Sequence, residues 1–221
     1  MKKRLAYIHT VMTLPAVFKA LSSELIPEVD VFNIVDESLL QNTIRENHLS
    51  HTTMRRLLGY IASAMEAGAD LVMVTCSSLG PAVDVAASLF DMPVLRVDQP
   101  MADLAVQTGK RIGVAATLKT TLDPTTSLVS ARAKAAGKEV EITAKLCEGA
   151  FEAVVSGDTA RHDALVKAGL RELTDRVEVV VLAQASMARV VDLLSEEERR
   201  IPILSSPRLA VEYLARMIPN L

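Results

Sequence analysis

Residues 69–85, ADLVMVTCSSLGPAVDV, decide the fold of this chain, because a similar stretch returns at residues 177–193 as VEVVVLAQASMARVVDL. In both, a short apolar run leads into small and polar residues and then into a helical pattern. Three further pairs of segments repeat in the same order, at offsets of 107 to 111 residues: 3–13 with 110–120, 28–37 with 139–148, and 92–95 with 201–204. Chance similarity would not keep both order and offset, so we expect two copies of one structural unit.

Each copy alternates strands with helices. Short, continuous apolar runs are typical of parallel strands buried on both faces. They lie at 5–9, 29–35, 70–75 and 93–97 in the first copy and at 111–116, 140–146, 177–183 and 202–206 in the second. Longer stretches with helical spacing separate them, such as residues 54–70 and 162–177. Strand, helix and strand in succession predict right-handed crossovers and a parallel sheet covered by helices.

The predicted fold class is therefore α/β. We expect two similar flavodoxin-like halves, each a four-stranded parallel sheet flanked by helices, related by a pseudo-twofold axis. The first half would comprise residues 1–98 plus 206–221, because a final serine-capped helix with Pro207 in its first turn would return to it. The second half would comprise residues 99–205. Open α/β sheets bind ligands at the carboxyl ends of their strands, so we expect an active site in a cleft between the halves.

The composition excludes several classes of partner. The 221 residues are 50% hydrophobic and carry a formal net charge of −3, with 3% aromatic residues and no Trp, which argues against nucleic-acid binding. No apolar stretch reaches the roughly 18 residues of a membrane helix, and the basic start lacks the apolar length of a signal peptide. Two cysteines argue against a disulfide framework. We expect a cytoplasmic protein without nucleic-acid or membrane partners, and a homo-oligomer, since dimers are the common default.

Polar residues that directly follow the predicted strands are the candidates for chemistry. In the first half they are His9, Thr10, Thr13, Asp36, Glu37, Cys76, Ser77 and Ser78. The corresponding polar positions of the second half are Thr117, Thr120, Cys147, Glu148, Gln184 and Ser186. Among these residues the thiol of Cys76 is the most reactive type of side chain.

Cys76 is the strongest of these candidates. It lies where a buried strand meets a helix, and the free N–H groups and dipole of a helix start favour an anion. The same field lowers the pKa of a thiol, so we expect an increased thiolate fraction. The hydroxyls of Ser77 and Ser78 would help to hold a carboxylate beside it. The alternative is a buried cysteine at a strand end, which is common; the repeat and the hydroxyls favour a functional role.

The other candidates are less decided. Cys147 has no hydroxyl cluster around it, so we expect it to pack in the core. Glu148 could be an acid/base or simply solvated, and His9 could bind substrate or be a strand-end histidine with satisfied hydrogen bonds. His162 is expected at the surface. No metal-ligand spacing, phosphate-binding loop or GxGxxG pattern occurs, so neither a metal nor a cofactor is predicted.

On these residues the chain resembles the aspartate/glutamate/hydantoin racemase superfamily over essentially its whole length. The resemblance rests on the two similar halves and on VTCSS (74–78), ATLKTT (116–121) and LAQASMA (182–188). It implies cofactor-independent chemistry on a small-molecule carboxylate. In this superfamily two cysteines, one from each half, take and return the Cα proton on opposite faces of the substrate. Cys76 matches the first of them.

The resemblance also implies which side chains would hold the substrate. Contacts to its carboxylate would come from Ser77, Ser78, Thr117 and Thr120. The other substrate-binding candidates, which follow from their places after the strands, are His9, Thr10 and Ser186.

One position departs from the family pattern: Gln184 stands where the second cysteine is expected. An amide neither donates nor accepts a proton usefully near neutral pH, and inversion by two bases needs a proton relay on both faces. Gln184 would then donate a hydrogen bond to the substrate, with Glu148 as the candidate second acid/base. The first hypothesis is an isomerase with racemase-like chemistry at Cys76. Two alternatives stay open: a single-cysteine decarboxylase or lyase, and a non-catalytic carboxylate-binding module.

Overall fold

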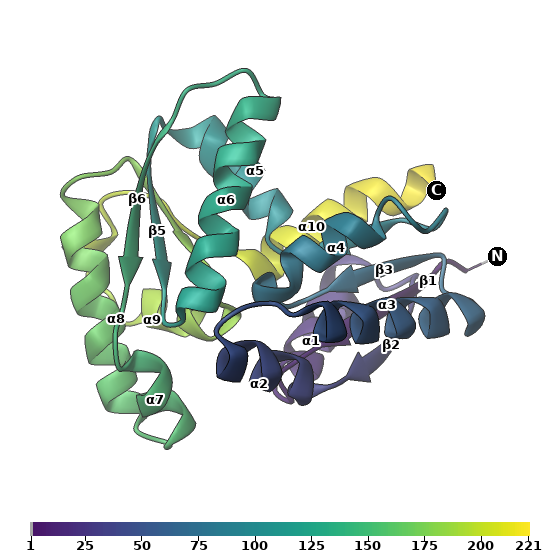
Figure 1. Ribbon diagram of the computed structural model, residues 1–221. Helices are drawn as coiled ribbons and strands as arrows, with labels where there is room; N and C mark the ends of the chain where they lie inside the picture. The colour runs from purple at the N-terminus through teal and green to yellow at the C-terminus, as the bar shows by residue number, and fades with distance from the viewer. Residues whose placement is uncertain (1) are drawn as a thin grey trace. The chain divides into compact units, whose positions relative to one another are not determined.

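The computed structural model describes residues 2–221, which form two compact units (Figure 1). One unit extends to Gln99 and also includes Pro207–Leu221, and the other comprises Pro100–Ser206. Each contains one four-stranded sheet in which every pair of neighbouring strands is parallel. The predicted α/β class with two similar halves is confirmed.

The first unit has the strand order β2-β1-β3-β4, which is the order of the first four strands in flavodoxin-like sheets. Its strands are β1 (Arg4–His9), β2 (Asp30–Val35), β3 (Leu71–Val74) and β4 (Val94–Arg96). Its helices are α1 (Leu14–Leu25), α2 (Glu37–Glu46), α3 (His51–Glu66), α4 (Gly80–Ala86) and α10 (Ser206–Met217), with the 3-10 helices η1 (Ser77–Leu79) and η4 (Ile218–Asn220).

The second unit repeats this order as β6-β5-β7-β8. Its strands are β5 (Arg111–Ala116), β6 (Glu141–Leu146), β7 (Val179–Leu182) and β8 (Ile203–Ser205). Its helices are α5 (Gln99–Thr108), which begins at the boundary, α6 (Lys119–Ala135), α7 (Ala150–Val155), α8 (Thr159–Thr174) and α9 (Ala188–Asp192), with η2 (Ala185–Met187) and η3 (Glu197–Arg199). All eight predicted strands are present.

The apolar runs of the sequence become the central strands of the two sheets. β3 and β7 are buried along their whole length, and β1 and β5 are buried except at their first residue. β2 and β6, at one edge of each sheet, are partly exposed. This pattern follows from parallel sheets whose middle strands are covered by helices.

The strand register shows the internal repeat in three dimensions. The last residue pair between β1 and β3 places Val74 two residues before Cys76. The corresponding pair between β5 and β7 places Leu182 two residues before Gln184. Cys76 and Gln184 therefore occupy equivalent positions in their own units.

The C-terminal helix α10 lies in the first unit, although the chain reaches it only after the whole second unit (Figure 1, yellow). Its apolar face is buried at Ala210, Val211 and Leu214. Arg208 at its start forms an ion pair with Glu24 of α1, at 2.7 Å. The apolar side chains carry most of the attachment, because an exposed ion pair contributes only about 0–1 kcal/mol.

Cys147 follows β6 and is buried in the apolar core of the second unit, as expected from its surroundings in the sequence. A Cβ placed on Gly169 of α8 would come within 2.6 Å of its Sγ, so this glycine makes room for the sulfur. Burial raises the pKa of Cys147 to about 11, which keeps the thiol neutral at physiological pH. Its role is packing.

Gly169→Ala should therefore destabilise the protein by about 1–3 kcal/mol, because the new methyl group overlaps the Cys147 sulfur in a packed core. The free energy of unfolding in urea measures the effect. Gly59→Ala in α3 is the matched control: no described heavy atom outside the helix backbone lies within 4 Å of its Cβ, and helix propensity should stabilise it by up to about 1 kcal/mol. Equal values for wild type and Gly169→Ala would contradict this packing.

Candidate active site

Cys76 lies just after β3, where the chain turns from strand into helix. Its backbone is extended (φ −123°, ψ 109°) and it caps the 3-10 helix η1, which leads directly into α4. The Cys76 carbonyl accepts a hydrogen bond from the N–H of Leu79 at 3.0 Å, which closes the turn. The residue is 9% exposed and belongs to the apolar core cluster of the first unit. The thiol is thus held at the carboxyl end of the sheet, almost out of contact with water.

Burial raises the pKa of Cys76 above its ordinary value, and this effect outweighs four hydrogen-bond donors that lower it. Those donors are the hydroxyl of Thr10, the N–H of Leu79, and the N–H and hydroxyl of Ser78. The expectation of a lowered pKa at a helix start is therefore wrong. A single 3-10 turn offers few N–H groups, and the apolar surroundings penalise the thiolate more than those groups stabilise it.

The site thus contains a neutral thiol with donors already in place for its anion. Near neutral pH the thiol of the free protein keeps its proton. Once a proton leaves, the hydrogen-bonding groups of Thr10, Ser78 and Leu79 favour the thiolate. Because its pKa is raised, the thiol is a weak acid, and its thiolate, once formed, takes up a proton readily.

Gln184 has the same place in the second unit. Its backbone is also extended (φ −127°, ψ 135°), and it caps the 3-10 helix η2. Its side-chain oxygen accepts two hydrogen bonds from Thr117, from the backbone N–H at 2.6 Å and from the hydroxyl at 3.0 Å. Because a backbone N–H can only donate, the amide must present its oxygen to Thr117 and its NH₂ group away from it.

The two units therefore share one hydrogen-bonded pair. In each, a threonine directly after the first strand bonds to the side chain that follows the third strand: Thr10 to Cys76, and Thr117 to Gln184. The geometry is repeated, but the chemistry is not. One unit presents a thiol and the other a carboxamide.

His9, the last residue of β1, is completely buried. Its Nδ1 lies 2.8 Å from the hydroxyl of Thr75, and its Nε2 lies 2.9 Å from the side-chain oxygen of Asn33. The rings of Tyr7 and Phe18 pack against it. Burial lowers its pKa, and the bond to Asn33 offsets this only in part. With both nitrogens engaged and the ring neutral, the structure favours the packing alternative for His9 over substrate binding.

The remaining predicted site residues differ in how far they are buried. Ser77 is buried in η1. Thr120 lies in the first turn of α6, and its buried hydroxyl has no hydrogen-bond partner among residues 2–221. Ser186 in η2 and Glu148 in the turn before α7 are exposed. The structure brings Thr10 and Ser78 to Cys76, and Thr117 to Gln184; that one ligand site joins the two groups stays a prediction.

His162 was expected at the surface, and this prediction is wrong. The side chain is fully buried at the start of α8, with its Nδ1 2.8 Å from the carboxylate of Asp163. Asp163 also accepts from Arg189 of α9 at 2.6 Å. The polar residues beside His162 in the sequence suggested exposure, but one of them, Asp163, binds both the imidazole and Arg189, and the imidazole is buried.

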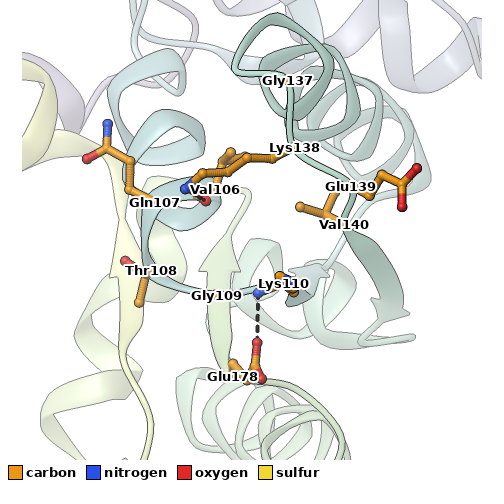
Figure 2. A pocket seen from close by; sticks show the side chains of 10 residues that line it. All are labelled: Val106, Gln107, Thr108, Gly109, Lys110, Gly137, Lys138, Glu139, Val140 and Glu178. Atoms are coloured by element: carbon orange, nitrogen blue, oxygen red, sulfur yellow. Dashed lines mark hydrogen bonds between the residues drawn. The ribbon is translucent and has the colours of Figure 1, made fainter.

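A hollow of about 710 Å³ lies in the second unit, lined by residues 106–110, 137–140 and Glu178. Figure 2 shows these side chains and the 2.7 Å hydrogen bond from the N–H of Lys110 to the Glu178 carboxylate. The lining residues directly precede β5, β6 and β7. The hollow is thus at the amino ends of these strands, opposite the edge where α/β sheets bind ligands and where Gln184 lies.

Neither a metal cluster nor a membrane helix is found among residues 2–221. Within this range no group of three or more His, Cys, Asp or Glu side chains is arranged to hold a metal ion. None of the helices described is both long and apolar enough to cross a membrane.

Comparisons with known proteins match nearly the whole chain. A protein-family model described as Asp/Glu/hydantoin racemase matches residues 10–214. Among solved structures, glutamate racemase from Francisella tularensis in complex with D-glutamate has a TM-score of 0.78 and 12% identity, covering 99% of this chain and 82% of that one. No curated protein matches the sequence.

Racemases of other substrates share the fold as well. Allantoin racemase from Klebsiella pneumoniae has a TM-score of 0.69 and 17% identity, over 99% of this chain and 88% of that one. Aspartate racemase from Picrophilus torridus has a TM-score of 0.68 and 15% identity, over 97% and 94%. At these identities the likeness concerns the fold, and it does not select a substrate.

The buried, neutral His9 predicts a specific loss of stability in acid. Because its pKa is depressed in the folded state, the unfolded chain takes up the proton more readily once the pH falls below about 6.5. The stability that the neutral His9 side chain contributes is fully present above that pH and is lost as the pH falls through the folded-state pKa. The difference in unfolding free energy between wild type and His9→Gln should shrink by about 1 kcal/mol from pH 7.5 to pH 5.5. Parallel pH profiles would show that His9 is not a buried neutral group.

Proposed function

Since the chain belongs to the Asp/Glu/hydantoin racemase family, we propose that it is a cofactor-independent enzyme with racemase-like chemistry, which exchanges a proton at the Cα of a small carboxylate with Cys76 as the acid/base. One observation carries this proposal. A buried thiol at the carboxyl end of β3 has hydrogen-bonding groups of Thr10, Ser78 and Leu79 around it, and each of them favours its anion. Packing alone does not require polar groups around a sulfur.

The reaction would begin with the small fraction of Cys76 that is ionised. The thiolate takes the Cα proton, and the electron pair of the broken C–H bond moves into the carboxylate to form an enolate. Fixed hydrogen-bond donors stabilise the charge that develops, and this stabilisation usually contributes most of the rate enhancement in such catalysis. The thiol then returns a proton to carbon. Ser77 and Thr120 are proposed as donors to the carboxylate; the unpartnered Thr120 hydroxyl is available for this.

Gln184 would bind the substrate without exchanging protons. Thr117 occupies its oxygen, so the NH₂ group is the part that can bind an acceptor such as a carboxylate oxygen. We propose the exposed Ser186 as a further contact and leave Glu148 as the candidate second acid/base. With an amide in place of a second thiol, proton exchange would occur on the face of the substrate that meets Cys76.

Decarboxylation is a second candidate, favoured by the raised pKa of Cys76. A decarboxylase needs an acid and no base at the same carbon. Loss of carbon dioxide breaks a C–C bond and leaves its electron pair on the remaining fragment as an enolate. The protonated Cys76 would give its proton to that carbon, and water would then reprotonate the thiolate.

Replacement of Cys76 tests both candidates. Amino acids, hydantoins, malonates and maleate-like diacids are incubated with the protein in deuterated water, and NMR reports deuterium at carbon, isomerisation and carbon loss. Cys76→Ala should lower any turnover found by at least about 10²-fold, because acid/base groups contribute roughly 10²–10⁴-fold. Circular dichroism should show an intact fold.

Cys147→Ala is the matched control for this test, since it removes the other thiol. It should retain turnover and lose stability through the cavity it leaves. Undiminished turnover in Cys76→Ala would end the proposal. Carboxylate binding without exchange or carbon loss would instead identify a binding module.

A further inference from the structure

A buried ion pair lies at the end of β4, beside the strand that leads to Cys76. Arg96 and Asp98 are almost completely buried, with side chains 5% and 1% exposed. The guanidinium donates to both carboxylate oxygens, from Nε to Oδ1 and from Nη2 to Oδ2, at 3.0 Å each. Its Nη1 reaches Asp84 of α4 at 2.7 Å. Arg96 thus connects the end of β4 to the helix that follows the Cys76 turn.

Gly80 brings the arginine still closer to that turn. It is the first residue of α4 and directly follows η1. A Cβ at this position would overlap the Arg96 guanidinium and would lie 2.8 Å from Nε. The cation therefore rests on the backbone at the point where the turn becomes a helix, and glycine is the residue that leaves room for it.

The second unit lacks this arrangement. Ser205 has the place of Arg96, since it pairs with Leu182 of β7 as Arg96 pairs with Val74 of β3. Ala188 is the first residue of α9, as Gly80 is of α4. The contacts of Arg96 with Asp84, Asp98 and Gly80, called the brace below, are thus present only in the unit that carries the thiol. A buried ion pair adds little net stability, because desolvation offsets most of the attraction between its charges. Its contribution here is to fix one arrangement of β4 and α4.

We infer that Arg96 and Gly80 are positioning residues for Cys76: by joining β4 to α4 they hold the intervening turn closed and so keep the Cys76 sulfur buried at the end of β3. The importance of this for catalysis rests on the proposed function. The groups that act on the Cys76 pKa are hydrogen-bond donors of Thr10, Ser78 and Leu79, so the arginine works through geometry rather than through its charge.

The test measures alkylation by iodoacetamide at pH 8 and quantifies the Cys76 and Cys147 peptides by mass spectrometry. Arg96→Lys keeps the cation but loses the planar fork that binds both oxygens of Asp98 and also reaches Asp84. The turn should open and rehydrate the sulfur. Because burial is the largest influence on the thiol, Cys76 should react about tenfold faster, with the Cys147 rate unchanged.

Gly80→Ala should act in the same direction as Arg96→Lys, and Gly59→Ala, which meets no described neighbour, should leave the rate at its wild-type value. If Arg96→Lys or Gly80→Ala fails to fold, Asp84→Ala decides, because the Asp84 side chain is 58% exposed and its loss removes one hydrogen bond of the brace; about a threefold acceleration is expected.

An unchanged Cys76 rate in the folded variants would overturn the inference, and so would parallel acceleration of Cys76 and Cys147, which indicates general destabilisation. The assay needs no substrate. Its outcome is therefore independent of whether Cys76 proves to be catalytic.

Discussion

The hydrogen bond between the residue after the first strand and the side chain after the third strand is the contact on which the site depends. It joins Thr10 to Cys76 in one unit and Thr117 to Gln184 in the other. Parallel strands make it available, because neighbouring strands of one sheet end at the same edge. The contact determines what each side chain can offer. The sulfur gains a donor for its anion, and the amide gives up its oxygen and keeps only N–H groups for a ligand.

Much of the fold could be predicted from the sequence, because a pattern that occurs twice in the same order rarely arises by chance. Four segment pairs at nearly one offset predicted two similar halves, and short apolar runs predicted all eight strands. The equivalence of Cys76 and Gln184 followed from the alignment, and the strand register agrees with it. Predictions from such a repeat are reliable, since each strand assigned in one half can be checked against the corresponding segment of the other half.

Features that depend on the balance of burial against hydrogen bonding could not be predicted in this way. Cys76 was expected to have a lowered pKa, but the apolar core around a short turn reverses the sign. His162 has polar neighbours in the sequence and is nevertheless completely buried in the structure. The Arg96–Asp98 pair was missed as well; its signal was two opposite charges, two residues apart, beside a buried strand, with a glycine where the other half has alanine.

Stereochemistry shows whether a single thiol exchanges protons on a single face of the substrate. Each enantiomer of aspartate, glutamate and 5-substituted hydantoins is incubated separately in deuterated water, and the products are separated on a chiral phase. We predict that deuterium enters one enantiomer with retention, and that Gln184→Cys allows it to appear in the opposite enantiomer. Wild-type protein that converts both enantiomers into deuterated mixtures at equal rates would contradict exchange by Cys76 alone.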